Sequence, residues 1–146
     1  MSPNGSPAPL SLVQDDAAEA EAFPIASEGL GAHSAELGLP GDWTPHWIIG
    51  RDADGAMRAG LRYVTTFDWL FVHLLWVDKA YRRQGVGSRL LSMAEAAARE
   101  KGCHGAYLDT FTFQAPEFYP RHGYSEFGRL EGFPPGHARI WFSKRL

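Results

Sequence analysis

The stretch YRRQGVGSRLL, Tyr81 to Leu91, constrains the fold of this chain more than any other feature. An almost continuously apolar run, WLFVHLLWV, ends shortly before it, and a helical pattern of apolar residues follows it. Gly85 and Gly87 stand where that helix begins, although each glycine weakens a helix by roughly 1 kcal/mol relative to alanine. This order predicts a central strand that enters a helix through a glycine-bearing turn, as in α/β proteins.

Such a turn predicts an anion-binding site. The first N–H groups of a helix have no partner within it, and they lie at the positive end of its dipole. Gly85 and Gly87 let a phosphate approach the backbone without meeting a Cβ atom, and Arg82 and Arg83 add positive charge. The glycine pair alone is equally compatible with a tight strand-to-helix connection. No Gly-Lys-Ser/Thr follows and a third glycine is missing, which excludes the phosphate loop of nucleotide hydrolases and the dinucleotide fingerprint.

Composition narrows the class of protein. The chain has 146 residues, of which 45% are hydrophobic and 13% aromatic, and this predicts a single domain over residues 11–146 after a flexible leader at residues 1–10. The formal net charge of -3 argues against nucleic-acid partners and binding to membrane surfaces. The single cysteine, Cys103, cannot form an internal disulfide, and no segment reads as a signal peptide, so we expect a cytoplasmic location.

The expected elements alternate between strands and helices. An acidic, alanine-rich segment predicts a helix over residues 15–28 that Pro24 interrupts or ends, followed by a loop over residues 29–45. The run WLFVHLLWV predicts a strand buried on both faces. The other expected elements are a hairpin over residues 46–66 with its turn at 52–55, a helix over 88–102, a strand over 106–111, a short helix over 115–123, and two strands over 124–130 and 138–146.

Two motifs resemble the GNAT superfamily of acyl-CoA-dependent N-acetyltransferases. The segment RRQGVG is similar to the family's pyrophosphate-binding loop, and APEFYPRHGY, residues 115–124, is similar to the segment that carries the family's tyrosine. The segments WLFVHLLWVD, YLDTFTFQAPEFY and FPPGH also look like a bacterial subgroup of this superfamily. The resemblance covers roughly residues 47–146. It implies an α/β fold with a mixed, mainly antiparallel sheet that is splayed near Trp76 and has helices on both faces.

The resemblance also implies a cosubstrate and the residues that hold it. The cosubstrate is acetyl-CoA, and no metal is expected. Thr112 stands where many relatives have an asparagine that bonds the pantetheine arm, and its hydroxyl can still bond an amide. The backbone at Trp76 and Val77 would meet the thioester. The pyrophosphate would be held by Arg82, Arg83, Gln84, Gly85, Val86, Gly87 and Ser88.

Tyr119 and His73 are the candidate catalytic side chains. By the resemblance Tyr119 is the general acid that protonates the leaving thiolate, and its alternative role is packing. His73 is a candidate base, since histidine titrates in the useful range, although a lone histidine in an apolar strand is more often a packing residue. Asp68 could serve instead or be a turn residue, and a water relay needs no dedicated base. Cys103 reads as packing rather than as a nucleophile.

These observations predict an N-acetyltransferase that acts on a small-molecule or peptide amine. The acetyl group would pass from acetyl-CoA to a primary amine by direct attack in a ternary complex. The alternative is a non-catalytic acyl-CoA-binding sensor or interaction domain. A homodimer is possible, as in many such folds. Six aromatic and acidic residues could form a pocket for a cationic amine: Trp43, Trp47, Trp69, Asp42, Asp68 and Glu131. The alternative is that they are core aromatic residues and surface acidic residues.

Overall fold

The computed structural model describes residues 5–146, which divide between Pro40 and Gly41 into two compact units. The first unit holds a short 3-10 turn, η1 (Asp16–Ala18), and the helix α1 (Glu19–Glu36). Of the predicted leader, residues 5–10 form no helix or strand, and residues 1–4 lie outside the described residues. The single domain over residues 11–146 stays a prediction.

The helix α1 differs from the sequence interpretation at both ends. It begins at Glu19, continues through Pro24 and ends only at Glu36, inside the segment predicted as a loop. A proline removes one helical hydrogen bond, and strong helix formers on both sides maintain the helix around it. The residues of α1 are exposed almost throughout, and none is buried. None of the helices in the described residues is long and apolar enough to cross a membrane.

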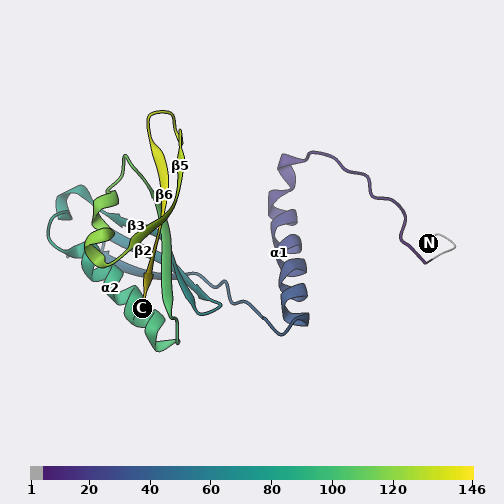
Figure 1. Ribbon diagram of the computed structural model, residues 1–146, viewed down its shortest axis with the longest axis horizontal. Helices are drawn as coiled ribbons and strands as arrows, with labels where there is room; N and C mark the ends of the chain where they lie inside the picture. The colour runs from purple at the N-terminus through teal and green to yellow at the C-terminus, as the bar shows by residue number, and fades with distance from the viewer. Residues whose placement is uncertain (1–4) are drawn as a thin grey trace. The chain divides into compact units, whose positions relative to one another are not determined.

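The second unit is built on a six-stranded sheet in the order β1-β2-β3-β4-β6-β5 (Figure 1). Neighbouring strands are antiparallel except β3 and β4, which are parallel and connected through the helix α2 (Val86–Glu100). This confirms the predicted mixed, mainly antiparallel sheet. The strands are β1 (His46–Arg51), β2 (Met57–Thr66), β3 (Trp69–Val77), β4 (Gly105–Phe111), β5 (Ser125–Glu131) and β6 (Ala138–Arg145).

The strand β3 is buried on one face only, so the expectation of burial on both faces was wrong. Val72 is buried, whereas Leu74 and Trp76 are 47% and 46% exposed. A bulge in the pairing with β2 leaves His73 unpaired between Val72 and Leu74. Because a bulge shifts the alternation of side chains by one position, it changes which residues of β3 face the core.

The helix α2 covers the buried face of the sheet (Figure 1). The predicted helix is confirmed, and it ends before Gly102, whose φ of +81° lies in the left-handed region that stops helices. Its apolar stripe buries Leu90, Leu91, Ala94 and Ala98 against β2 and β3. Helix cover on the second face stays a prediction.

The buried carboxylate of Glu95 connects α2 to the last strand, β6, through an ion pair. Glu95 is only 5% exposed, and its carboxylate lies 2.8 Å from Lys144 Nζ. The Tyr124 hydroxyl donates to the same carboxylate at 3.0 Å. A buried carboxylate requires such partners, because an unpaired charge in the core is strongly unfavourable.

The short helix predicted over residues 115–123 is instead two 3-10 turns. The turn η3 (Pro116–Phe118) is followed after Tyr119 by η4 (Pro120–His122). Each turn begins with a proline, and Pro120 has no N–H with which to extend a helix from the preceding turn. Tyr119 therefore lies at a break between two turns rather than within a regular helix.

The sheet splays between β3 and β4. These two strands pair only from Trp69 with Gly105 to Val72 with Leu108. Beyond this point β3 continues to Val77 and pairs with β2 alone. The last residues of β3 therefore have an edge that no β4 residue occupies, as expected near Trp76.

Candidate active site

The loop between β3 and α2 is held in place by its own side chains. Arg82 Nε donates to the carbonyl oxygen of Val77 at 3.0 Å, which ties the loop to the end of β3. Gln84 Nε2 donates to the carbonyl oxygen of Ala80 at 3.3 Å, within the preceding 3-10 turn η2 (Lys79–Tyr81). Both predicted cofactor-binding side chains thus also shape the loop.

The two glycines of the loop have different surroundings. Gly85 has a φ of +76°, and a Cβ atom added there would meet no atom within 4 Å. Its backbone conformation requires glycine, and its open side can admit a ligand. A Cβ atom on Gly87 would instead point inward, 3.5 Å from the Phe118 ring and 3.8 Å from Val77. These are ordinary contact distances, so Gly87 lies against protein atoms rather than open space.

Arg83 carries backbone strain at the centre of this loop. Its φ of +61° is left-handed, a conformation that costs a residue with a side chain about 1–2 kcal/mol. The Arg83 residue is exposed, so no core packing explains the strain. Strained residues of this kind cluster where the backbone holds a ligand.

The N-terminus of α2 is open to an anion. Gly85 is the N-cap residue, and no side chain caps the helix. The bond from Arg89 N–H to the Gly85 carbonyl, at 3.1 Å, marks the first turn, so the N–H groups of Val86, Gly87 and Ser88 precede it. The first turn carries no acidic residue. Uncapped N–H groups and nearby arginines fit the pyrophosphate of a coenzyme.

Tyr119 is held by aromatic side chains near the splay, because its neighbour Phe142 pairs with Leu108, the β4 residue of the last β3–β4 pair. Its ring centroid is 5.8 Å from that of Phe142 on β6 and 6.0 Å from that of Tyr124. Burial, and to a lesser degree the negative charge of Asp109, raises the pKa of Tyr119 to about 12. The phenol is therefore protonated throughout the physiological range, as a proton donor must be.

Asp109, on β4, is paired within the protein. Arg139 Nη2 and Nε lie 2.6 and 2.8 Å from the same carboxylate oxygen of Asp109. The Arg139 guanidinium also lies 5.1 to 5.5 Å from the ring centroids of Phe111, Phe133 and Trp141. The Asp109 charge is thus partly neutralised, and it acts on Tyr119 from a fixed position.

His73, the candidate base, is exposed and bonded to an arginine. Arg62 Nη1 lies 2.8 Å from His73 Nδ1. A guanidinium has only donors, so Nδ1 must accept this bond and the proton of the neutral ring is on Nε2. In this arrangement the only lone pair of His73 that could accept a proton is already occupied.

Thr112 is also engaged. Its hydroxyl oxygen accepts from the Ala138 N–H at 3.0 Å and lies 3.4 Å from His137 Nδ1. The Thr112 N–H in turn donates to the Ala138 carbonyl at 3.0 Å. The residue therefore closes the end of β4 onto the start of β6, and its predicted bond to pantetheine stays a prediction.

Comparison with known proteins now decides the family. The family model of the acetyltransferase (GNAT) domain matches residues 42–126, more than half of the chain. The chain belongs to the GNAT acetyltransferases. The match begins beside the boundary of the second unit and includes both the loop at Arg82 and the turns around Tyr119.

Three relatives support this assignment. Acetyltransferase Atu2258 of Agrobacterium fabrum is 36% identical over 137 residues, which are 94% of this chain and all of that protein. Blasticidin-S acetyltransferase of Streptomyces morookaense is 47% identical over 93 residues, 63% of this chain and 68% of that protein. The crystal structure of an acetyltransferase from Bacillus cereus superposes with a TM-score of 0.78 at 34% identity, covering 94% of this chain and 98% of that one. The chain is thus an acyltransferase.

One contact of this acetyltransferase was missed in the sequence. His122 Nδ1 lies 2.7 Å from the Phe118 carbonyl oxygen, and Nε2 lies 2.9 Å from the Ser88 hydroxyl. The ring is half-buried and packs on the Phe118 ring at a centroid distance of 4.3 Å. Its position within APEFYPRHGY, three residues after Tyr119, was the available signal.

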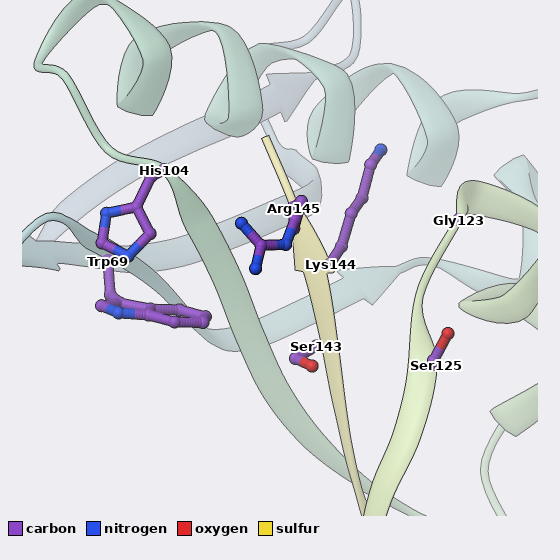
Figure 2. Close-up of a pocket in the computed structure, with 7 residues that line it drawn as sticks. All are labelled: Trp69, His104, Gly123, Ser125, Ser143, Lys144 and Arg145. Atoms are coloured by element: carbon purple, nitrogen blue, oxygen red, sulfur yellow. The ribbon is translucent and has the colours of Figure 1, made fainter.

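Two of the tryptophans considered for an amine pocket make separate contacts. Trp43 packs edge-on against Phe67, and the Trp69 ring lies over Gly105. Trp69 lines a different pocket of about 460 Å³ with His104, Gly123, Ser125, Ser143, Lys144 and Arg145 (Figure 2). That pocket includes the first residues of β3 and β5 and the last of β6, so it lies at the end of the strands opposite the splay.

Cys103 is buried in the core, and burial raises the pKa of its thiol. A buried, protonated thiol is a poor nucleophile, which agrees with its reading as packing. Within the described residues, no group of three or more histidine, cysteine, aspartate and glutamate side chains is arranged to hold a metal.

Proposed function

We propose that this GNAT acetyltransferase transfers an acetyl group from acetyl-CoA to a primary amine by direct attack in a ternary complex. The observation that carries the proposal is the placement of three features in one region. An uncapped helix N-terminus lies beside arginines, and the free edge of β3 follows the last β3–β4 pair. Tyr119 packs against Phe142, which pairs with Leu108 of that last β3–β4 pair. The first feature suits a pyrophosphate, the second a pantetheine amide, and the third a leaving thiolate.

The reaction requires two bonds to change and one proton to be relocated. The amine nitrogen attacks the thioester carbonyl carbon, a C–N bond forms, and the C–S bond breaks. The Tyr119 hydroxyl passes its proton to the leaving sulfur while the proton lost by the amine is returned to the phenol oxygen through solvent. The two transfers are coupled, because the pKa of Tyr119 is about 12 and that of an ordinary thiol is about 8.5, and Tyr119 is neutral before and after the reaction.

The pair of His73 and Arg62 defines the condition for base catalysis. His73 can accept a proton at Nδ1 only after the Arg62 guanidinium moves away. We therefore assign deprotonation of the amine to a water relay in the arrangement described, with His73 as base only if substrate displaces Arg62. Cys103 forms no acetyl intermediate in this proposal, because it is buried in the core.

Small amine antibiotics lead the set of candidate acceptors. The 47% identical relative carries blasticidin S in its name, and its match covers 68% of that protein. The half-exposed Trp76 offers an apolar surface beside the splay for the body of such a compound.

The proposed location of the enzyme is the cytoplasm. The lone, buried Cys103 fits this reducing compartment.

The test combines acetyl-CoA binding by calorimetry with thiol release in the presence of amines. The panel contains blasticidin S, aminoglycosides, polyamines, amino acids and lysine peptides. We expect acetyl-CoA to bind without an amine, and thiol to be released only with the correct amine. Failure of acetyl-CoA to bind would refute the proposal.

A matched pair of charge reversals controls this test. Arg83→Glu places a negative charge in the pyrophosphate loop and should weaken acetyl-CoA binding at least tenfold. Arg145→Glu makes the same change at the opposite end of the strands, where it should leave binding unaltered.

The alternative of a non-catalytic acyl-CoA sensor has little support, because relatives that match this chain are named acetyltransferases. The bond between Arg62 and His73 does not favour the sensor, because a water relay needs no histidine base. Acetyl-CoA binding without thiol release on any amine would support the sensor. Amine-dependent release would exclude it.

A further inference from the structure

His122 bonds two parts of the molecule that the proposed reaction requires at the same time. One ring nitrogen faces the first turn of α2 at Ser88, and the other faces the turn that carries Phe118. Ser88 belongs to the helix start proposed to hold the pyrophosphate, and Phe118 immediately precedes Tyr119. Within residues 5–146, no other side-chain hydrogen bond joins the first turn of α2 to the turns around Tyr119.

The direction of these hydrogen bonds follows from their partners. A carbonyl oxygen can only accept, so His122 Nδ1 carries a proton and donates to Phe118. In the neutral ring Nε2 then has a lone pair, and the Ser88 hydroxyl donates to it. The proton of the Ser88 hydroxyl therefore points toward His122, and the backbone N–H of Ser88, in the uncapped first turn of α2, has no partner within the helix.

Packing makes this connection stiff. The His122 ring lies on the Phe118 ring at 4.3 Å, and the Phe118 ring in turn lies 3.5 Å from the position of a Cβ atom on Gly87. An alanine at position 87 would make an ordinary contact with this ring, and a side chain longer than that of alanine would increase the distance between the helix start and Phe118. Hydrogen bonds and aromatic contacts thus fix the same two segments relative to each other.

We propose that His122 is a positioning residue, which holds the pyrophosphate-binding turn of α2 and the Tyr119 hydroxyl in register. The proposal rests on the function proposed above, because it requires acetyl-CoA to extend from Ser88 to Tyr119. A thioester held by its pyrophosphate reaches the phenol only if the distance between these segments is fixed, and small errors in position are costly for catalysis.

The test is a double-mutant cycle between Ser88→Ala and His122→Ala. Ser88→Ala loses one hydrogen bond and should lower kcat about 3- to 10-fold, and His122→Ala, which also loses the bond to Phe118, should lower it at least as much. The double variant should be no slower than His122→Ala alone, because both changes remove the same bond. Losses that multiply in the double variant would overturn the proposal.

Two further variants separate the contributions of the two hydrogen bonds of the His122 ring. His122→Asn can still donate to the Phe118 carbonyl and loses the bond to Ser88, so its kcat should equal that of Ser88→Ala. His122→Gln can place an amide oxygen near Ser88 and should recover part of the lost kcat. Equal kcat for the alanine, asparagine and glutamine variants would contradict a positioning role.

Controls distinguish failure of this inference from failure of the proposed function. Wild-type protein that binds no acetyl-CoA would overturn both, whereas normal binding and turnover in His122→Ala would overturn only the role of His122. His104→Ala removes an exposed histidine from the pocket of Figure 2 and should leave kcat and KM unchanged. If His122→Ala does not fold, Ser88→Ala removes the same bond and decides the question by its kcat.

Discussion

Tyr119 combines burial with a nearby negative charge, and both keep its phenol neutral. Burial is the larger effect on its pKa, and Asp109 adds to it. Asp109 is itself held by Arg139, so its position relative to Tyr119 is fixed. Tyr119, the proposed proton donor, is therefore protonated throughout the range near neutral pH.

Replacing Tyr119 by phenylalanine tests this role. The variant Tyr119→Phe should lower kcat by about 100-fold, the usual effect of losing a general acid, and leave the acetyl-CoA Kd within about twofold. Steady-state kinetics and calorimetry measure the two quantities.

Tyr124→Phe is the matched control, because Tyr124 is a buried tyrosine bonded to Glu95. It should lower stability by about 1 kcal/mol without changing kcat. A kcat loss shared by both variants would point to a general packing effect.

The raised pKa of Tyr119 also predicts how stability depends on pH. The folded-state pKa is about 12 and the ordinary value is 10.0, so the folded protein holds its phenolic proton more tightly than the unfolded chain does. The associated stability is complete below pH 10 and is lost as the pH rises toward 12. Burial raises the pKa of Tyr124 as well, which adds to the loss.

Thermal unfolding at a series of alkaline pH values measures this effect. The melting temperature should fall more steeply above pH 10 for the wild type than for Tyr119→Phe, which has no phenol at that position. Parallel curves for the two proteins would show that Tyr119 titrates alike in the folded and unfolded states.

The loop between β3 and α2 is the element on which the proposed cosubstrate binding depends. Its shape comes from two left-handed residues, Arg83 and Gly85, and from the bond of Arg82 to the end of β3. The loop and α2 form one unit, because Gly85 is both the last loop residue and the N-cap of the helix.

Substitutions at Gly85 test whether its backbone conformation is the reason for glycine. A side chain there meets open space, so Gly85→Ala should lose stability only through the left-handed conformation, by about 1 kcal/mol. Gly85→Asn should lose clearly less, since asparagine tolerates this conformation and caps helices well. Chemical denaturation gives both values. Equal losses in the two variants would mean that the backbone is not the cause.

The glycine turn and the helix α2 were predictable because their structure is determined by residues close together in the sequence. Gly85 and the apolar stripe of α2 act within a few residues of sequence, so the helix and its glycine turn were predicted correctly. The burial of side chains along β3 was not predicted correctly, because the bulge at His73 depends on pairing with β2. The contact of His122 with Ser88 joins residues 34 positions apart, and no local pattern encodes such a bond.

At the scale of the whole molecule, the core and the candidate site belong to the same unit. The largest fully buried side chains, Leu61, Leu70, Leu91 and Leu108, all lie after Gly41. The family match starts at residue 42, and every candidate site residue follows it. In contrast, α1 buries none of its residues. The core and the proposed cosubstrate site therefore depend on the same part of the chain.

A fragment of residues 41–146 tests this division. Because it contains the whole sheet, α2 and the buried Glu95 with its partners, it should unfold in one cooperative transition. Its melting temperature should lie within about 5 °C of the full chain, equivalent to about 1 kcal/mol for a domain of this size. Its Kd for acetyl-CoA should match that of the full chain, as measured by calorimetry.

A fragment that unfolds without cooperativity would show that residues 1–40 complete the core. A folded fragment that binds acetyl-CoA but acetylates no amine accepted by the full chain would place acceptor recognition in those residues.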